Sequence, residues 1–238
     1  MCPMAWLRRR ALSLVFALIA LGVVPGQTSP SARFAVLEPG IFHGQDVALL
    51  QPNDWVGVYC NRDGCEVRPT SVRVKRAADE LVDDDPSHPT GTSVEVSSRV
   101  QPVFLVHGLP ASAHRVETVF QGENSIAAGE EQQFSLKGRH YSLRITGKAS
   151  EQEPLPKGSR LLLSDGVTTQ ELFSLPNGGT DAYVSVLWVG DIDGDGKPDF
   201  YINASDHYNV ANKVLWLSSL GEKWQLVGRA AAFVTTGC

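Results

Sequence analysis

The chain has few of the features that would place it in several familiar protein classes. Its 238 residues include only 4 cysteines, too few for a small domain built on disulfide bonds. Lys and Arg number 21 against 26 Asp and Glu, so there is no basic excess to favour nucleic acid or an anionic membrane. Helical periodicity of convincing length is absent from the mature chain. With 42% hydrophobic and 20% charged residues, the composition is that of a globular protein.

One short hydrophobic run stands near the N-terminus. Three arginines at 8–10 precede fourteen uncharged residues at 11–24, and Pro25-Gly26 begins a small, polar exit. This order is typical of a secretory signal peptide. Fourteen residues are few for a bilayer core of about 30 Å, although an uncleaved signal anchor is the alternative. We therefore predict a signal peptide at 1–26, a secreted or periplasmic location, and no membrane span once the leader is removed.

Three cysteines lie beyond this leader. Cys60 and Cys65 flank the turn sequence Asn-Arg-Asp-Gly, between an apolar run and an alternating one, which predicts a β-hairpin closed by a disulfide. Closing so small a ring contributes about 2 kcal/mol, so the bond would be a local staple. A redox pair or half of a zinc site is the alternative reading. Cys238 is left over, and is free, mispaired or the link of a dimer.

Strand-like alternation dominates the sequence from residue 40 onward. Apolar and polar residues alternate with period two at 72–75, 94–97 and 141–146, the pattern of half-buried strands. Further strand candidates are 103–106, 116–120, 161–163, 171–175, 183–189, 200–203, 214–217 and 224–227. Short strands at spacings of about ten residues, separated by turn residues, predict an all-β fold, an antiparallel β-sandwich or a barrel-like sheet.

An acidic stretch with two prolines interrupts this pattern at 77–92. It is either a linker or a solvated hairpin loop, and the two readings are equally supported. As a linker it divides the chain into an N-terminal β unit at 33–92 and a C-terminal β domain at 93–238. No repeat of fixed period runs through the chain, which gives no support to a repeat architecture.

The strongest chemical motif lies at 191–199, with the sequence DIDGDGKPD. Asp191, Asp193, Asp195 and Asp199 place four carboxylates within nine residues, and their repulsion favours a bound cation. Hard oxygen ligands suit calcium better than zinc or copper. Lys197 can offer its main-chain carbonyl oxygen. We therefore predict calcium as cofactor, with an ion-free acidic turn as the alternative.

The sequence around this motif distinguishes between two types of calcium loop. An EF-hand requires a bidentate Glu at its twelfth position, where this chain has Ile202 within a strand-like run. The run before Asp191 is also strand-like, which predicts a strand, loop, strand setting. Residues 190–200 resemble the calcium loop of FG-GAP and VCBS-type repeats of secreted and cell-surface β proteins. This resemblance implies the four Asp side chains and the Lys197 carbonyl as ligands, and it covers about 20 residues.

Other residues that carry chemistry favour structural roles. Ser205, Asp206 and His207 are consecutive, and neighbours on a strand face opposite sides, so they predict a strand-end turn rather than a catalytic relay. Three tryptophans among the C-terminal strands are predicted to be core residues, with a sugar-stacking surface as the alternative: Trp188, Trp216 and Trp224.

These observations favour a secreted or periplasmic, non-catalytic β protein that binds calcium in a structural or binding role. Its partner would be a protein or a glycan, which the sequence does not identify. A secreted, carbohydrate-acting hydrolase using calcium as a structural ion is one alternative. The other is an envelope-associated structural subunit linked through Cys238.

Overall fold

A computed structural model gives the structure of the chain and describes residues 33–44, 46–49, 51, 53–79, 82–85 and 87–237. The predicted signal peptide and Cys238 lie outside the described residues. Within them the chain is almost entirely strand, with one three-residue 3-10 helix, η1 (Ser218–Leu220). None of the helices in this described part is long and apolar enough to cross a membrane. The predicted all-β class is confirmed.

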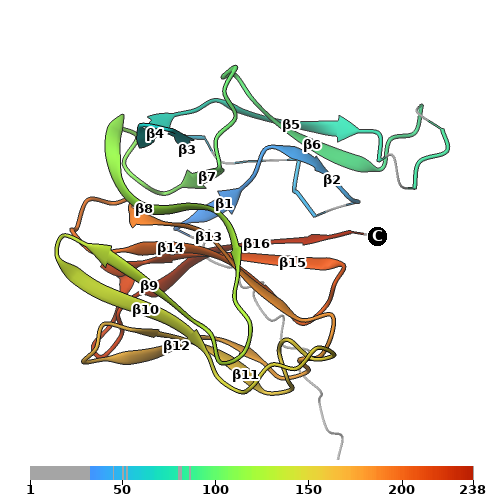
Figure 1. Cartoon of the computed structure of the whole chain (residues 1–238). Coiled ribbons are helices and arrows are strands. Elements are labelled where there is room, and N and C mark those ends of the chain that lie inside the picture. Colours follow the sequence, from blue (N-terminus) through green and yellow to red (C-terminus); the bar gives the residue numbers. More distant parts are fainter. Residues whose placement is uncertain are drawn as a thin grey trace, which may run out of the picture. The chain divides into compact units, whose positions relative to one another are not determined.

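A nine-stranded antiparallel sheet forms the centre of the fold (Figure 1). Its outermost strands, β1 and β16, pack against each other, so the sheet is nearly closed into a barrel. In spatial order the strands are β1 (Ala35–Leu37), β7 (Phe104–His107), β3 (Trp55–Asn61), β4 (Gly64–Pro69), β8 (His114–Ser125), β13 (Tyr183–Asp191), β14 (Asp199–Ser205), β15 (Val210–Leu217) and β16 (Gly228–Thr236).

Two smaller antiparallel sheets flank this barrel-like sheet, one above and one below it in Figure 1. The four-stranded sheet has the order β12 (Thr169–Leu175), β11 (Ser159–Ser164), β10 (Arg139–Ile145) and β9 (Glu131–Leu136). The three-stranded sheet has the order β2 (Gly40–Phe42), β6 (Gly91–Val96) and β5 (Val72–Ala77).

The strands β13 and β14 separate two hydrophobic clusters. Successive side chains on a strand point to opposite faces. Trp188 and Tyr201 accordingly join Phe104 in the cluster inside the barrel-like sheet, where the Phe104 and Tyr201 ring centroids are 4.5 Å apart. Val189 and Phe200 belong to the other cluster, against the four-stranded sheet. Every residue of β14 is buried, which fixes the position of the loop that precedes it.

The predicted β3–β4 hairpin and its disulfide are present. Cys60 faces Cys65 in the strand register, and the two form a disulfide with their Cα atoms 4.1 Å apart. The disulfide joins β3 to β4 next to the turn of the hairpin, at a single position of the barrel-like sheet. It is therefore the local staple that the turn sequence predicts.

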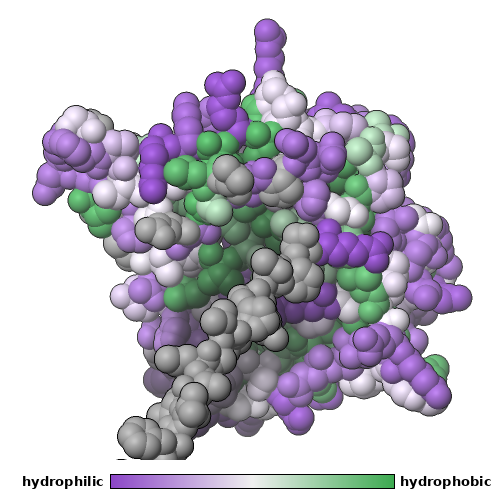
Figure 2. All heavy atoms as spheres, turned by 180° about the vertical axis from the view of Figure 1, so that it is seen from behind, coloured by the Kyte–Doolittle hydropathy of each residue, from purple (hydrophilic) through white to green (hydrophobic). Residues whose placement is uncertain are grey.

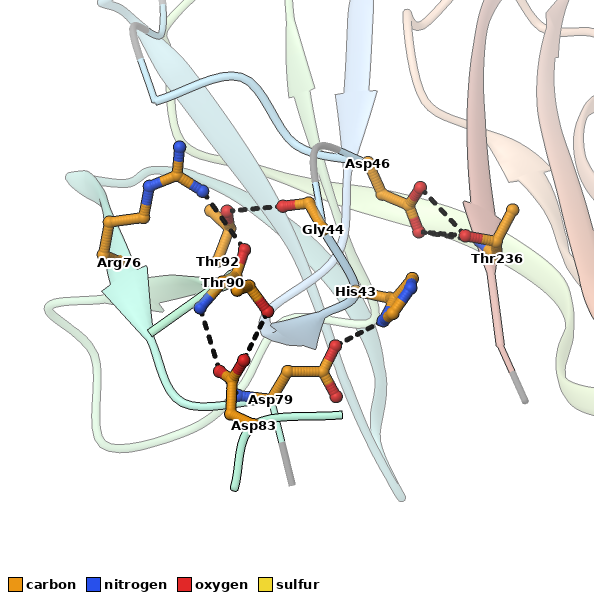
Figure 3. A network of polar contacts seen from close by, with 9 residues as sticks. All are labelled: His43, Gly44, Asp46, Arg76, Asp79, Asp83, Thr90, Thr92 and Thr236. Atoms are coloured by element: carbon orange, nitrogen blue, oxygen red, sulfur yellow. Dashed lines mark hydrogen bonds and ion pairs between the residues drawn. The ribbon is translucent and has the colours of Figure 1, made fainter. Parts of the chain in front are cut away.

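The acidic stretch at 77–92 connects β5 to β6, which pair from Ala77 and Gly91 onward. Its hydrogen bonds are drawn in Figure 3. Asp83 accepts hydrogen bonds from the Asp79 backbone N–H at 2.8 Å, the Thr90 backbone N–H at 2.9 Å and the Thr90 hydroxyl at 2.6 Å. The stretch is a hairpin connection, and the division predicted between residues 92 and 93 falls inside β6. Strands from both sides of that division build the nine-stranded sheet.

Two expectations near the C-terminus are wrong. The predicted strand at 224–227 is a turn, and the last strand is β16, at 228–236. Trp188 and Trp216 are buried as expected, but Trp224 is 79% exposed and has φ of 72°. The apolar spacing of residues 224–227 resembled a strand, whereas the alanines of β16 have low strand propensity and gave a weaker signal.

Candidate metal centre

The Asp-rich loop joins the two central strands of the barrel-like sheet. β13 ends at Asp191 and β14 begins at Asp199, so the strand, loop, strand setting is present and EF-hand helices are not. Gly194 and Gly196 have φ of 79° and 84°, values that glycine adopts without steric cost. These two glycines allow the chain to turn within seven residues and bring the aspartates back toward one another.

Three of the predicted ligands converge. Asp191, Asp193 and Asp195 each offer one carboxylate oxygen, and these oxygens lie within 4.8 Å of one another. Calcium binds oxygen at 2.3–2.6 Å, so two ligands on opposite sides of the ion are about 5 Å apart. The three carboxylates therefore fit within a single calcium coordination sphere.

Asp191 carries the most informative geometry. Its side chain is only 4% exposed. One oxygen, Oδ2, accepts hydrogen bonds from the Lys137 ammonium and the Gly196 backbone N–H, each at 2.9 Å. The other oxygen, Oδ1, is buried and has no hydrogen-bond partner among the described residues. A buried carboxylate oxygen without a partner is costly, so Asp191 Oδ1 fits the role of a cation ligand.

The carboxylates of Asp193 and Asp195 are held by η1, which follows β15. The Ser219 hydroxyl donates to Asp193, and the Lys197 backbone N–H donates to Asp195 Oδ1 at 2.8 Å. The Ser218 hydroxyl lies 2.9 Å from both Asp195 Oδ1 and Asp199 Oδ1. Because a serine hydroxyl has one proton, it donates to only one of these oxygens at a time.

Asp199 holds the loop in place from its buried side. It is fully buried, Oδ2 accepts the Ile192 backbone N–H at 2.8 Å, and Oδ1 accepts the Ser218 backbone N–H at 2.7 Å. Asp199 lies outside the three-carboxylate group. Its role as a ligand, like that of the Lys197 carbonyl, stays a prediction.

The site has an excess of negative charge. Four aspartates lie within nine residues, whereas the nearby ammonium groups are Lys197 of the loop and Lys137, which contacts Asp191 and Glu117, so carboxylates outnumber ammonium groups here. Burial, and next the charge of Asp193, raise the pKa of Asp199 to about 8. Burial also raises the pKa of Asp193. The hydrogen bond to Asp191 raises the pKa of Lys137, so this lysine stays charged.

Sequence reasoning missed the residues that hold the loop in place. Lys137 comes from the turn between β9 and β10, where Lys137 and Gly138 have φ of 47° and 77°. His114 of β8 lies with its Nε2 atom 3.1 Å from the Ile192 carbonyl oxygen. A Lys-Gly pair is a signal for a two-residue hairpin turn, but it does not tell which loop the lysine reaches.

The other candidate residues have partners within the fold. Ser205, at the end of β14, accepts a hydrogen bond from the His207 backbone N–H at 3.1 Å, as expected for a strand-end turn. Asp206 accepts a hydrogen bond from the Asn177 side-chain amide at 2.5 Å, which links this turn to a segment 29 residues earlier in the chain.

No protein-family model, curated protein or solved structure matches this chain. The case for a metal centre therefore rests on the loop itself, namely its spacing, its converging carboxylates and the unpartnered oxygen of Asp191.

Proposed function

We propose that this protein is an exported, non-catalytic β protein whose 191–199 loop binds calcium, and that the ion has a structural role. Asp191, Asp193 and Asp195 supply the central carboxylates, and Asp199 and the Lys197 carbonyl are the further ligands implied by the FG-GAP/VCBS resemblance. Two observations on Asp191 carry the proposal: one of its carboxylate oxygens converges with those of Asp193 and Asp195, and its buried Oδ1 has no hydrogen-bond partner among the described residues.

The chemistry of the donors favours calcium over other ions. The converging atoms are carboxylate oxygens, and the group contains no His or Cys. Oxygen-only ligand sets suit calcium and magnesium, whereas zinc and copper prefer nitrogen and sulfur. Magnesium demands a near-ideal octahedron at 2.0–2.1 Å, while calcium accepts the looser spacing of a flexible loop.

The position of the loop supports a structural role. It touches the four-stranded sheet through Lys137, β8 through His114, and η1 through Ser218 and Ser219. A bound calcium ion would supply positive charge to a loop in which carboxylates are in excess. The Asp carboxylates could then keep these segments together without mutual repulsion.

Export is the second part of this proposal. The basic and apolar leader at 1–26 supports it, and the Cys60–Cys65 disulfide is compatible with an oxidising compartment. A secreted or periplasmic protein of this kind would meet calcium at the concentrations that extracellular sites require. The protein or glycan that it would bind there is not identified by these features.

Isothermal titration calorimetry with calcium tests the site directly. The mature chain, starting at Gln27, is compared with Asp193→Ala and with Asp181→Ala, which removes an exposed aspartate outside the loop. We expect one calcium per chain in the parent and in Asp181→Ala, and at least tenfold weaker binding in Asp193→Ala. Equal calcium binding by all three proteins, or none by the parent, would contradict the proposal.

A further inference from the structure

A second feature lies away from the metal centre. A pocket of about 500 Å³ is lined by residues that come from several different strands of the barrel-like sheet. Val103 precedes β7, Gln121 belongs to β8, Leu187 to β13 and Lys213 to β15. These strands are not all neighbours in the strand order, and Gln121 and Gly122 are exposed, so the pocket lies where the strands come together and is open to solvent. Barrels of about eight strands have room for packed side chains or for one small ligand.

Three polar groups meet in this pocket. The Tyr201 hydroxyl donates a hydrogen bond to Glu38 Oε1 at 2.9 Å, and the Lys213 ammonium contacts Glu38 Oε2. The side chains of Lys213 and Glu38 are 20% and 19% exposed, so the ion pair is mostly withdrawn from water yet still accessible. Withdrawing such a pair from water is costly, and the attraction between the two charges repays this cost only in part. Burial and the Glu38 carboxylate raise the pKa of Tyr201, which therefore remains a hydrogen-bond donor.

The hydrogen-bond ladder of the sheet is irregular at the same place. On β14, Ile202 and Tyr201 pair with Val186 and Trp188, so Leu187 between them has no partner in the register. On the other side, the register of β13 with β8 also shifts between Val186 and Trp188. Bulges of this kind redirect side chains and occur preferentially beside functional sites. Leu187 and Gly122, both at this irregularity, line the pocket.

The pocket is open to a larger hollow. Glu38 and Val103 also line a cavity of about 890 Å³, whose other walls include Ile41, Val94 and Val96 of the three-stranded sheet. Figure 2 shows a face of the molecule that is hollowed, with hydrophobic side chains in the hollow and hydrophilic ones around it. The shared residues Glu38 and Val103 show that the pocket and the larger hollow are adjacent.

We propose that the pocket binds a small, uncharged and mainly apolar molecule that carries one hydrogen-bonding group. Glu38 and Lys213 contribute −1 and +1, so the pocket has no net formal charge. Because Glu38 and Lys213 neutralise each other, a charged ligand would lose hydration in the pocket without meeting a net opposite charge, whereas a hydroxyl, carbonyl or amide can hydrogen-bond to the pair. The apolar walls of Val103 and Leu187 receive the body of the ligand.

A matched pair of fluorescent probes tests this proposal. N-phenyl-1-naphthylamine is uncharged, apolar and carries one N–H, and 8-anilinonaphthalene-1-sulfonate is the same skeleton with an added sulfonate. Each is titrated with the mature chain, and binding is followed by the rise in probe emission. We expect saturable binding of the uncharged probe and at least tenfold weaker binding of the sulfonate.

Three variants locate the binding. Val103→Trp fills the pocket, and Gln121→Trp narrows it from an exposed position where a large side chain leaves the core intact. Val167→Trp is the control, at a residue that is 93% exposed and does not line the pocket. Both pocket variants should bind the uncharged probe at least tenfold more weakly, and the control should match the parent.

Several results would overturn the proposal. These are no saturable binding by the parent, equal binding by the parent and by a folded Gln121→Trp variant, or stronger binding of the sulfonate than of the uncharged probe. The pocket and the 191–199 loop share no residue, so the probe titration and the calcium titration are separate tests, and a failure of one is distinguishable from a failure of the other.

Discussion

At the scale of single residues, Asp191 and Lys137 define the state of the metal centre. Asp191 offers one oxygen to the Lys137 ammonium at 2.9 Å and keeps the other without a hydrogen-bond partner in the described part of the chain. The lysine thus supplies one positive charge to a loop that has an excess of negative charge. A cation at Oδ1 and the ammonium at Oδ2 would repel each other, so under the proposed function the lysine would weaken calcium binding while it supports the ion-free loop.

Replacing this lysine tests that antagonism. In Lys137→Met we expect calcium to bind about three- to tenfold more tightly, a change of roughly 0.6–1.4 kcal/mol in binding free energy. The variant lacks the positive charge that repels the ion. The calcium-free protein should at the same time unfold more easily. Calorimetry and denaturant unfolding measure the two effects, and Lys148→Met removes an exposed lysine as the control. Unchanged or weaker calcium binding in Lys137→Met would show that the ammonium does not oppose the ion.

Asp83 gives a prediction about pH at a separate position. Hydrogen bonds from Asp79 and Thr90 lower its pKa below the ordinary 3.8 (Figure 3). A group whose pKa is lower in the folded state stabilises the fold above its unfolded-state pKa and loses this contribution as pH falls through the folded-state value. Asp83→Asn should therefore be less stable than the parent by a constant amount from about pH 7 to pH 5, with the difference shrinking below about pH 4.

Urea unfolding of both proteins across this pH range measures the difference. Asp84→Asn, at an exposed neighbour, is the matched control. A gap between parent and Asp83→Asn that stays constant down to about pH 2.5 would contradict the role assigned to these hydrogen bonds.

At the scale of elements, sequence patterns were most informative where one face of a strand is buried. The alternation at 141–146 and the apolar runs at 183–189 and 200–203 correspond to β10, β13 and β14. The strand β9, EQQFSL, has two apolar residues among polar ones, and β16 has three alanines, so neither gave a clear signal. The spacing of the aspartates predicted the loop, but Lys137 and Ser218 reach it only through the tertiary fold.

The β3–β4 hairpin supports a quantitative expectation. Replacing Cys60 and Cys65 together by serine should lower the free energy of unfolding by about 2 kcal/mol, since the disulfide closes only a short loop. For a chain of this size the melting temperature should fall by roughly 4–8 °C. Denaturant unfolding of the parent and the double variant measures the loss. Equal stability of the two proteins would show that the hairpin holds its register without the bond.

At the scale of the whole molecule, the strands β13 and β14 contribute side chains to both hydrophobic clusters. The acidic loop connects these two strands. The sequence predicted the all-β class because period-two alternation is a local property. It named a barrel-like sheet as one of two arrangements, but it did not give the strand order, because strand order depends on contacts between distant segments, such as β1 with β7 and β16. An ion that orders the 191–199 loop would therefore act on the register of the central strands, and on the stability of the whole fold.

Thermal unfolding of the mature protein in EDTA and in millimolar calcium, with magnesium as control, tests this claim most directly. With calcium at about 100 times its dissociation constant, linkage adds roughly 2.7 kcal/mol to the stability. The melting temperature should then rise by roughly 5–10 °C in calcium, more than in magnesium, and Asp193→Ala should show no such rise. No calcium-specific rise in the parent, or an equal rise in the variant, would contradict the account.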